Sequence, residues 1–273
     1  MTIRSRHRRA PRLPASLGLA LAVLLSAAPA APETPVEKRP CLWTHVGEEL
    51  VRLVEAPVKG SWAGYGVAAV FGAGLVAALE HDVAGYRWVQ DHRTDLLDKT
   101  MPVATLLGDG LFHLGASAAL YQFGDRRDRR VAAMAVEGQI NVAVVSVLLK
   151  AVFTATRPDL TVRDPSRRWF TVDPRHNGFP SGHTMTAFCA AAILGRGYDL
   201  EWLAYPLAAA AAYSRVYNQR HFPADVVAGA GIGLLIGHTV ADLHAERREG
   251  RPAVRFTLLP RRDGSLGVVT WRY

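Results

Sequence analysis

The sequence predicts an all-α fold, a helical bundle of about six core helices, with a small C-terminal β-hairpin. Six apolar segments, each of helical length and each followed by polar or Gly- and Pro-containing residues, predict the bundle. Between residues 60 and 245 there is no alternating strand pattern and no internal repeat. The tail does alternate on either side of Asp263-Gly264, which predicts the hairpin. The apolar segments cover residues 60–79, 101–120, 131–149, 184–194, 202–213 and 226–240.

The first 30 residues predict a secretory signal peptide. They contain five arginines and no acidic residue, then an apolar run over residues 15–28 and the small-residue pattern Ala28-Pro29-Ala30. A retained membrane anchor is the alternative interpretation, and it is less favoured because the run is short for a membrane span. Loss of the five arginines lowers the formal net charge from +8 to +3 and removes the main support for nucleic-acid binding. We therefore expect an exported, periplasmic protein that is associated with the membrane.

The rest of the chain divides into a linker and N-terminal segment at residues 31–59, a helical domain at 60–245 and a basic tail with the hairpin at 246–273. We expect Cys41 and Cys189 to be small hydrophobic residues rather than a disulfide, because Cys189 lies within an apolar helix. There is no Cys/His zinc pattern and no acidic cluster suited to Mg²⁺, so no metal and no cofactor are expected.

Lys150 and Arg157 form the first of three motifs. They are seven residues apart, so on one helix they lie two turns apart on the same face. Pro158 would then end that helix and leave Arg157 at its mouth. Glu137 and Asn141 project roughly opposite this face, and we interpret them as interhelical hydrogen-bonding residues.

The second motif, Pro180-Ser181-Gly182-His183, opens the next apolar segment. Ser181 is a good N-cap residue, and Gly182 allows a close approach to the backbone. The free N–H groups of a helix start form an anion site. His183 would stand beside that site with a proton to donate.

The third motif runs from Ser214 to Asp225. Pro223 is suited to the first position of a helix, which places His221 just outside it and Asp225 in its first turn. From there the carboxylate can reach back over the helix start and hold one nitrogen of the imidazole. Arg215, six residues before His221, is suited to bind an oxyanion with two hydrogen bonds.

Each motif alone also fits a structural role, such as a capped helix start or a lysine that extends from a helix. In order, however, they read Lys-x6-Arg-Pro, Pro-Ser-Gly-His and Ser-Arg-x5-His-x3-Asp, with no position missing. This set resembles the signature of the type-2 phosphatidate phosphatase superfamily, which also contains the bacterial class A acid phosphatases and the vanadium haloperoxidases. The motifs extend over residues 150–225, and the resemblance covers the helical body from about residue 60 to 243.

The resemblance implies a metal-independent phosphatase. His221 would attack phosphorus to form a phosphohistidine, His183 would protonate the leaving oxygen, and Asp225 would orient His221. The remaining motif residues would bind the phosphate, namely Lys150, Arg157, Ser181, Gly182 and Arg215. The loop at residues 159–179 is expected to overhang the site and to meet the leaving group.

Export and the apolar body favour a phosphorylated lipid as substrate, such as phosphatidate or a polyprenyl diphosphate, at a membrane surface. Three alternatives stay open: a soluble periplasmic nonspecific acid phosphatase, a vanadium-dependent haloperoxidase and a non-catalytic phosphate-binding protein. Two histidines argue against the last, because binding alone needs only the cations. We expect no nucleic-acid partner and no obligate protein partner.

Overall fold

The computed structural model describes residues 42–59, 62–160, 169–170, 177–248, 254–261 and 264–271. Residues Pro40–Tyr273 form one compact unit. The predicted signal peptide, residues 31–41 and Cys41 lie outside the described residues, so the predictions made for them stay predictions. Cys189 is a free, buried thiol, as its apolar surroundings indicated.

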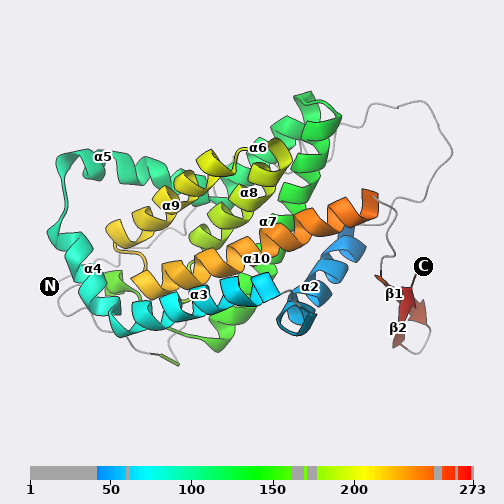
Figure 1. Ribbon diagram of the computed structural model, residues 1–273, viewed down its shortest axis with the longest axis horizontal. Coiled ribbons are helices and arrows are strands. Elements are labelled where there is room, and N and C mark those ends of the chain that lie inside the picture. The colour runs from blue at the N-terminus through cyan, green and yellow to red at the C-terminus, as the bar shows by residue number, and fades with distance from the viewer. Residues whose placement is uncertain are drawn as a thin grey trace, which may run out of the picture. The chain divides into compact units, whose positions relative to one another are not determined.

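Helices make up the described part of the chain up to residue 248 (Figure 1). In chain order they are α2 (Leu42–Lys59), α3 (Trp62–Glu80), α4 (Asp82–Asp91), α5 (Asp95–Ala104), the 3₁₀ helix η1 (Thr105–Gly108), α6 (Gly110–Phe123), α7 (Arg126–Val152), the 3₁₀ helix η2 (Pro158–Leu160), α8 (Gly182–Tyr198), α9 (Glu201–Tyr217) and α10 (Pro223–Arg248).

The predicted fold class needs a correction. The body is all-helical, but it has nine α-helices rather than about six, and no strand occurs among the described residues from 42 to 248. The helical body itself therefore contains no β-hairpin. The strands β1 (Val254–Arg261) and β2 (Gly264–Trp271) pair antiparallel with each other in a two-stranded sheet after α10. The additional helices α2, α4 and α5 carry charged residues, so a search for long apolar segments passes over them.

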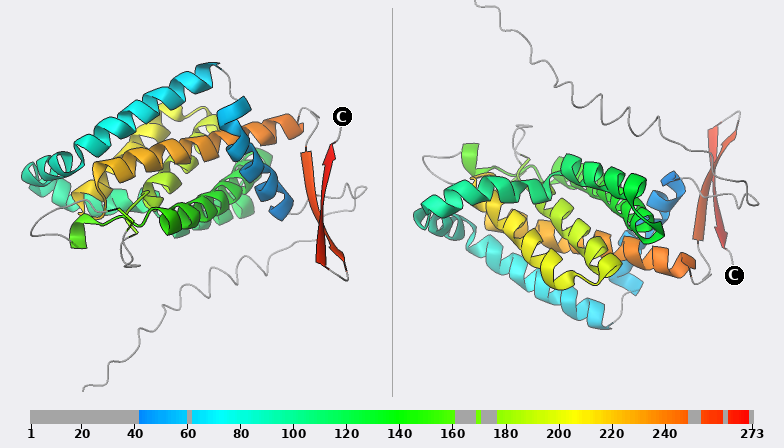
Figure 2. Two further views of the ribbon diagram at one scale, coloured as in Figure 1. Left: turned by 90° about the horizontal axis from the view of Figure 1, so that it is seen from below. Right: turned by 90° about the horizontal axis from the view of Figure 1, so that it is seen from above.

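Helix α10 is the centre of the bundle and packs against α8, α3, α7 and α2, with α3 beside it in every view (Figures 1 and 2). The largest buried cluster joins α7, α8 and α10 through side chains that include Val142, Met185, Ile193 and Ile236. A second cluster joins α4, α5 and α9 around Tyr217 and Phe222. Helix α8 thus lies between α10 and α9, which places the start of α8 next to the α9–α10 connection.

Three glycines bring α10 against the backbone of α8, and we call them the glycine seam: Gly229, Gly233 and Gly237. A Cβ atom added at Gly233 would lie 2.4 Å from the carbonyl oxygen of Met185. At Gly229 and Gly237 it would lie 2.7 Å and 2.6 Å from the carbonyl oxygens of Ser181 and Cys189. Spaced by four residues, the glycines share one face of α10, and any side chain there would push the helices apart.

The predicted single helix at residues 101–120 is wrong, because the chain breaks between η1 and α6. The side chain of Asp109 accepts hydrogen bonds from the N–H groups of Leu111 and Phe112 and so starts a new helix. At Gly108, an added Cβ would lie 2.7 Å from the carbonyl oxygen of His183. The break therefore brings η1 into contact with the start of α8.

Within the part of the chain that the structure describes, two helices, α7 and α10, are long and apolar enough to cross a membrane. Two bent pairs, Ala68–Glu80 with Asp82–Asp91 and Asp95–Gly108 with Gly110–Phe123, raise that number to four if each pair is one span. Large apolar side chains are also exposed on several helices, with Val147 67 %, Trp202 73 % and Phe123 86 % accessible. A helical body with this much exposed apolar surface is suited to a lipid environment.

Candidate active site

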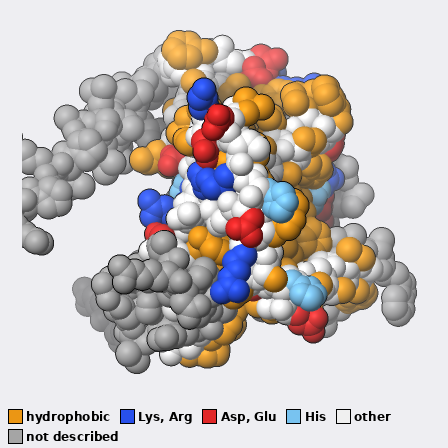
Figure 3. Space-filling model, turned by 90° about the vertical axis from the view of Figure 1, so that its left-hand side faces the viewer, with side chains coloured by type: hydrophobic (Ala, Val, Ile, Leu, Met, Phe, Trp, Pro, Cys, Tyr) orange, Lys and Arg blue, Asp and Glu red, His pale blue; other side chains and the backbone are white. Residues whose placement is uncertain are grey.

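The three motifs meet where α9 ends and where α8 and α10 begin. In the face drawn in Figure 3, charged and histidine side chains run down the middle and hydrophobic side chains flank them. This face is the end of the bundle at which α10 starts (Figure 1).

The third motif has the local structure that the sequence predicts. Helix α10 begins at Pro223, and Asp225 lies in its first turn. The Oδ2 atom of Asp225 accepts a hydrogen bond from the N–H of Phe222 at 3.0 Å and lies 3.3 Å from Nδ1 of His221. Both side chains of this pair are buried, with 3 % and 0 % of their surface accessible. The carboxylate therefore fixes the imidazole and the helix start together.

The second motif is joined to the third through the backbone. Ser181 is the N-cap of α8, as predicted, and its Oγ accepts from the N–H of Thr184 at 3.4 Å. The N–H of Ser181 donates to the carbonyl oxygen of Asp225 at 3.0 Å. Gly182 is the first residue of α8, and His183 follows it. The anion-binding end of α8 is thus held beside His221 and Asp225.

Arg215 is held in place by its backbone. The chain turns through Gln219, which has a φ of 60°, and the N–H groups of Arg220 and His221 donate to the carbonyl oxygen of Arg215 at 2.9 and 3.2 Å. Its side chain is 9 % accessible, and Nη1 lies 3.5 Å from Oγ1 of Thr105. Within the described residues, the buried Nε of Arg215 has no hydrogen-bond acceptor. A buried guanidinium donor without an acceptor is suited to an anionic ligand.

The expected helix through Lys150 and Arg157 is wrong, because α7 ends at Val152. Lys150 lies in its last turn and donates to the carbonyl oxygen of Asn177 at 3.2 Å, whereas Arg157 lies in the segment between α7 and η2. They do not share a helix face. The positive charges of both nevertheless act on the imidazole of His221, so the fold brings them to the same region.

The electrostatic environment favours neutral imidazoles before an anion binds. Burial lowers the pKa of His221 below its ordinary value, Asp225 opposes that shift, and the charges of Arg157 and Lys150 add to it. Burial lowers the pKa of His183 to about 4, with the charge of Arg215 as the next cause. Since positive neighbours cause part of both shifts, a bound phosphate would oppose them.

Arg215 keeps its charge at neutral pH in spite of its surroundings. Burial, followed by the positive charges of Arg220 and Arg157, lowers its pKa to about 10. A guanidinium with this pKa is still protonated at pH 7. The site therefore contains arginine side chains close enough to repel one another, and this repulsion lowers the stability of the folded protein when no anion is bound.

Two supporting residues were not found from the sequence. Asp82, the first residue of α4, is 3 % accessible, and its Oδ1 accepts from the N–H of Ala224 at 2.7 Å, at the start of α10. Thr105, in η1, contacts Arg215 and also lies 2.9 Å from Oγ of Ser214. Neither stands near a motif in the sequence, and a lone Asp or Thr gives no signal of a contact more than a hundred residues away.

Most of the loop at residues 159–179 lies outside the described residues, so its predicted contact with the leaving group stays a prediction. At its start, Asp159 accepts from Arg220 Nη1 at 2.8 Å. Trp169, at the middle of the loop, packs against Phe179 at its end, with ring centroids 5.1 Å apart.

Comparison with known proteins places the motifs within a recognised family domain. Residues 131–249 match the PAP2 superfamily. The chain is 41 % identical over 66 residues to a lipid A 1-phosphatase of Porphyromonas gingivalis, covering 22 % of this chain and 15 % of that protein. It is 29 % identical over 163 residues to a decaprenylphosphoryl-5-phosphoribose phosphatase of Mycobacterium tuberculosis, covering 57 % of this chain and 88 % of that protein.

Among solved structures, Aquifex aeolicus LpxE is similar, with 25 % identity and a TM-score of 0.49. The match covers 59 % of this chain and 94 % of that one. The two curated relatives with the matches given above are both named as phosphatases, and each name includes a lipid or lipid-linked compound.

Proposed function

Because residues 131–249 form a PAP2 superfamily domain, we propose that this protein is a metal-independent phosphatase that hydrolyses lipid-linked phosphomonoesters or diphosphates through a phosphohistidine intermediate. One arrangement carries the proposal. The N–H of His221, in the buried His221–Asp225 pair, donates to the backbone carbonyl of Arg215, and the buried guanidinium of Arg215 lies close enough to His183 for its charge to lower the pKa of that imidazole. A nucleophile, its orienting carboxylate and an oxyanion-binding cation are thereby held together.

The first step transfers the phosphoryl group to His221. Nε2 of His221 attacks phosphorus, the N–P bond forms as the P–O bond to the leaving group breaks, and His183 donates a proton to the departing oxygen. Asp225, 3.3 Å from Nδ1, fixes the tautomer that leaves Nε2 unprotonated. The guanidinium of Arg215 and the N–H groups at the start of α8 stabilise the charge on the equatorial oxygens.

The second step releases phosphate. Water attacks the phosphohistidine, the N–P bond breaks, and His183, now neutral, accepts the proton from the water. The electrostatics described above suit this double use. In the free protein the low pKa of His183 keeps it neutral, and the negative charge of the bound phosphoester favours its protonation before the first step.

The proposed substrate is a phosphorylated lipid. The spans through α7 and α10 and the exposed apolar side chains favour a membrane location, and the expected signal peptide would place the site on the periplasmic side. A substrate held in the bilayer would reach a site at the end of the bundle without leaving the membrane. The names of the curated relatives support this substrate class.

A phosphate-release panel tests the proposal. The full chain in detergent micelles is assayed with phosphatidate, a polyprenyl diphosphate, a lipid A analogue and the soluble ester p-nitrophenyl phosphate. We expect at least a tenfold higher kcat/KM for one of the lipids than for the soluble ester, and no release by the His221→Ala variant. Equal rates on all four would support a soluble acid phosphatase instead, and no release from any of them would contradict a phosphatase.

A further inference from the structure

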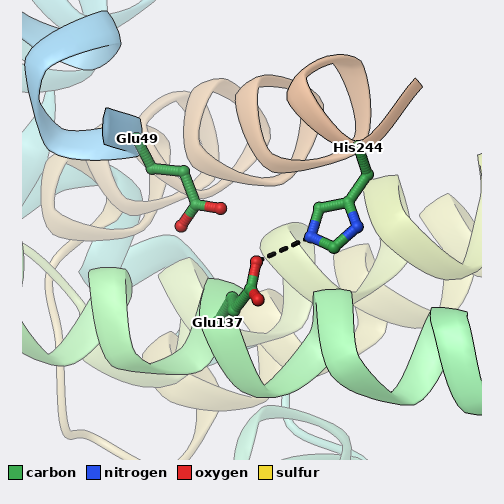
Figure 4. Close-up of side chains that lie close together, drawn as sticks. All are labelled: Glu49, Glu137 and His244. Atoms are coloured by element: carbon green, nitrogen blue, oxygen red, sulfur yellow. Dashed lines mark hydrogen bonds and ion pairs between the residues drawn. The ribbon is translucent and has the colours of Figure 1, made fainter. Parts of the chain in front are cut away.

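A second group of ionisable side chains lies inside the bundle, between α2, α7 and α10 (Figure 4). It consists of Glu49, Glu137 and His244, which we call the carboxylate cluster, and no part of the proposed reaction uses it. Each residue offers one ligand atom, and these atoms lie within 4.8 Å of one another. Nε2 of His244 lies 2.7 Å from Oε2 of Glu137, and the carboxylate of Glu49 points toward both (Figure 4).

The carboxylate cluster is separate from the candidate active site. Glu137 lies thirteen residues before Lys150 on α7, and His244 lies nineteen residues after Asp225 on α10. At the rise of an α-helix these separations correspond to about 20 Å and about 28 Å. The same two helices therefore carry both polar groups, with the carboxylate cluster at the middle of α7 and near the end of α10.

Burial makes this group costly unless a cation accompanies it. The side chains of Glu49 and Glu137 are 0 % and 3 % accessible. Oε2 of Glu49 accepts from Nδ2 of Asn141 at 2.5 Å, but Oε1 is buried and has no hydrogen-bond partner in the described residues. A buried carboxylate oxygen without a hydrogen-bond donor strongly destabilises the folded state.

The neighbouring positive charge does not compensate these carboxylates. Arg247 donates to Glu48 at 2.9 Å and lies 4.0 Å from Oε2 of Glu137. Three carboxylates, those of Glu48, Glu49 and Glu137, thus lie near one guanidinium, and two negative charges are left over when all three are ionised and His244 is neutral. A divalent cation would balance them.

We propose that Glu49, Glu137 and His244 bind one divalent transition-metal ion of the Zn²⁺ class, which ties α2 to α7 and α10. Two carboxylates and an imidazole form a mixed oxygen and nitrogen donor set, which is typical of Zn²⁺ and Mn²⁺ rather than of Ca²⁺ or Mg²⁺. The three ligands come from helices far apart in the sequence, so the ion would act on the stability of the bundle. Its role is structural, because the site lies far from the reacting groups.

A cavity of about 400 Å³ lies beside His244. The cavity lies between α7, α8 and α10, and His244 is one of its lining residues. Arginines also line it, among them Arg127 and Arg196, but these two are ion-paired with Asp199 and Asp242.

The test uses the full chain, purified in detergent without a polyhistidine tag, stripped with EDTA and reloaded with Zn²⁺. We expect about one equivalent of zinc per chain by elemental analysis, and a melting temperature that rises with Zn²⁺ more than with Mg²⁺. Glu49→Gln, which keeps the side-chain shape, and His244→Ala should each retain less than a tenth of that zinc. The matched control is His238→Ala, which removes a half-buried histidine of the same helix that lies 3.3 Å from Tyr205.

Two results would overturn the proposal. One is zinc binding that Glu49→Gln leaves unchanged, which would place the ion elsewhere on the chain. The other is absence of binding together with a higher melting temperature for metal-free Glu49→Gln, which would show that the two carboxylates share a proton instead. Circular dichroism checks that each variant keeps its helical content, and if His244→Ala does not fold, Glu49→Gln decides the result.

Discussion

The same helical body contains two histidine–carboxylate pairs in opposite settings. His221 and Asp225 lie at a loop and a helix start, next to arginines and to the N-terminus of α8. His244 and Glu137 lie within helices, next to a second carboxylate and far from any helix start. The first pair has an excess of positive charge around it and is suited to an anion, whereas the second has an excess of negative charge and is suited to a cation. The partner charges, and not the pair itself, decide what each can bind.

The largest expected effect comes from removing the two histidines in turn. His221→Ala should lower turnover by about 10⁴-fold or more, because it removes the nucleophile, while the melting temperature stays nearly unchanged. His244→Ala should do the reverse, with a lower melting temperature and turnover within about twofold of wild type at 25 °C.

Trapping of ³²P measures the first half of this comparison. An acid-labile, base-stable phosphoprotein should form on the wild-type chain and on His244→Ala but not on His221→Ala. Labelling of the His221→Ala variant would show that another residue is the nucleophile.

Removal of the proposed general acid should have the next largest effect. His183→Ala should lower the hydrolysis of alkyl phosphates by about 10²- to 10⁴-fold and that of aryl phosphates much less, since a good leaving group needs no proton. His238→Ala is the control, as a histidine outside the site. Equal losses on both ester classes would leave His183 as a phosphate ligand only.

The pH profile gives a second measure of His183. Its pKa is lowered to about 4 in the free protein, so the protonated form that donates to the leaving group becomes scarcer as the pH rises above that value. For alkyl phosphates, kcat/KM should therefore fall with rising pH across the neutral range. In His183→Asn this fall should be absent.

The response to an anion, which depends on Arg215, distinguishes the candidate active site from the carboxylate cluster. Phosphate or vanadate should raise the melting temperature of the wild-type chain, because the anion relieves repulsion among the arginines and lysine of the site. Arg215→Ala should remove most of that rise and about 10²- to 10³-fold of kcat, without making the ligand-free protein less stable. Arg215→Lys should restore little, since an ammonium cannot form two parallel hydrogen bonds. A less stable ligand-free variant with an unchanged phosphate response would make Arg215 a structural residue.

Chelation should have the smallest effect on rate. In excess EDTA the initial rate at 25 °C should stay within about twofold, because side chains supply all the cations of the proposed reaction. The melting temperature should fall, because the carboxylate cluster loses its ion. Loss of activity that Mg²⁺ or Zn²⁺ restores would contradict a metal-independent mechanism.

The helix starts around His221, Asp225 and Ser181 were predictable from the sequence, whereas of the carboxylate cluster only the interhelical hydrogen bond of Glu137 was expected, and the reason is local structure. Ser181 and Pro223 mark helix starts through their own backbone chemistry, so the positions of His221 and Asp225 follow from a few neighbouring residues. The contact of Asn141 with Glu49 confirms the expected interhelical hydrogen bond of Asn141, but its partner could not be named. Glu49 stands 88 residues before Glu137 in the sequence, and no motif joins them.

The errors have the same origin. Lys150 and Arg157 fit one helix face by spacing, but α7 ends at Val152 and tertiary packing brings Arg157 to the site by another route. The chain breaks at Asp109 because a side-chain cap and a close approach at Gly108 outweigh an apolar run. The described residues contain nine α-helices, more than the six or so expected, because amphipathic helices such as α2 bury only one face and lack a long apolar run.

The glycine seam affects how a mutational scan of this chain would be interpreted. At Gly229, Gly233 and Gly237 every other amino acid places a Cβ atom within 2.7 Å of a backbone carbonyl oxygen of α8. Ser181, whose carbonyl faces Gly229, starts the helix that holds His183, so a shift of this contact would move the proposed general acid. A screen that scores only activity would rank these glycines with the histidines, although they contact no substrate. Expression level scored beside activity would separate positions that shape the site from positions that perform its chemistry.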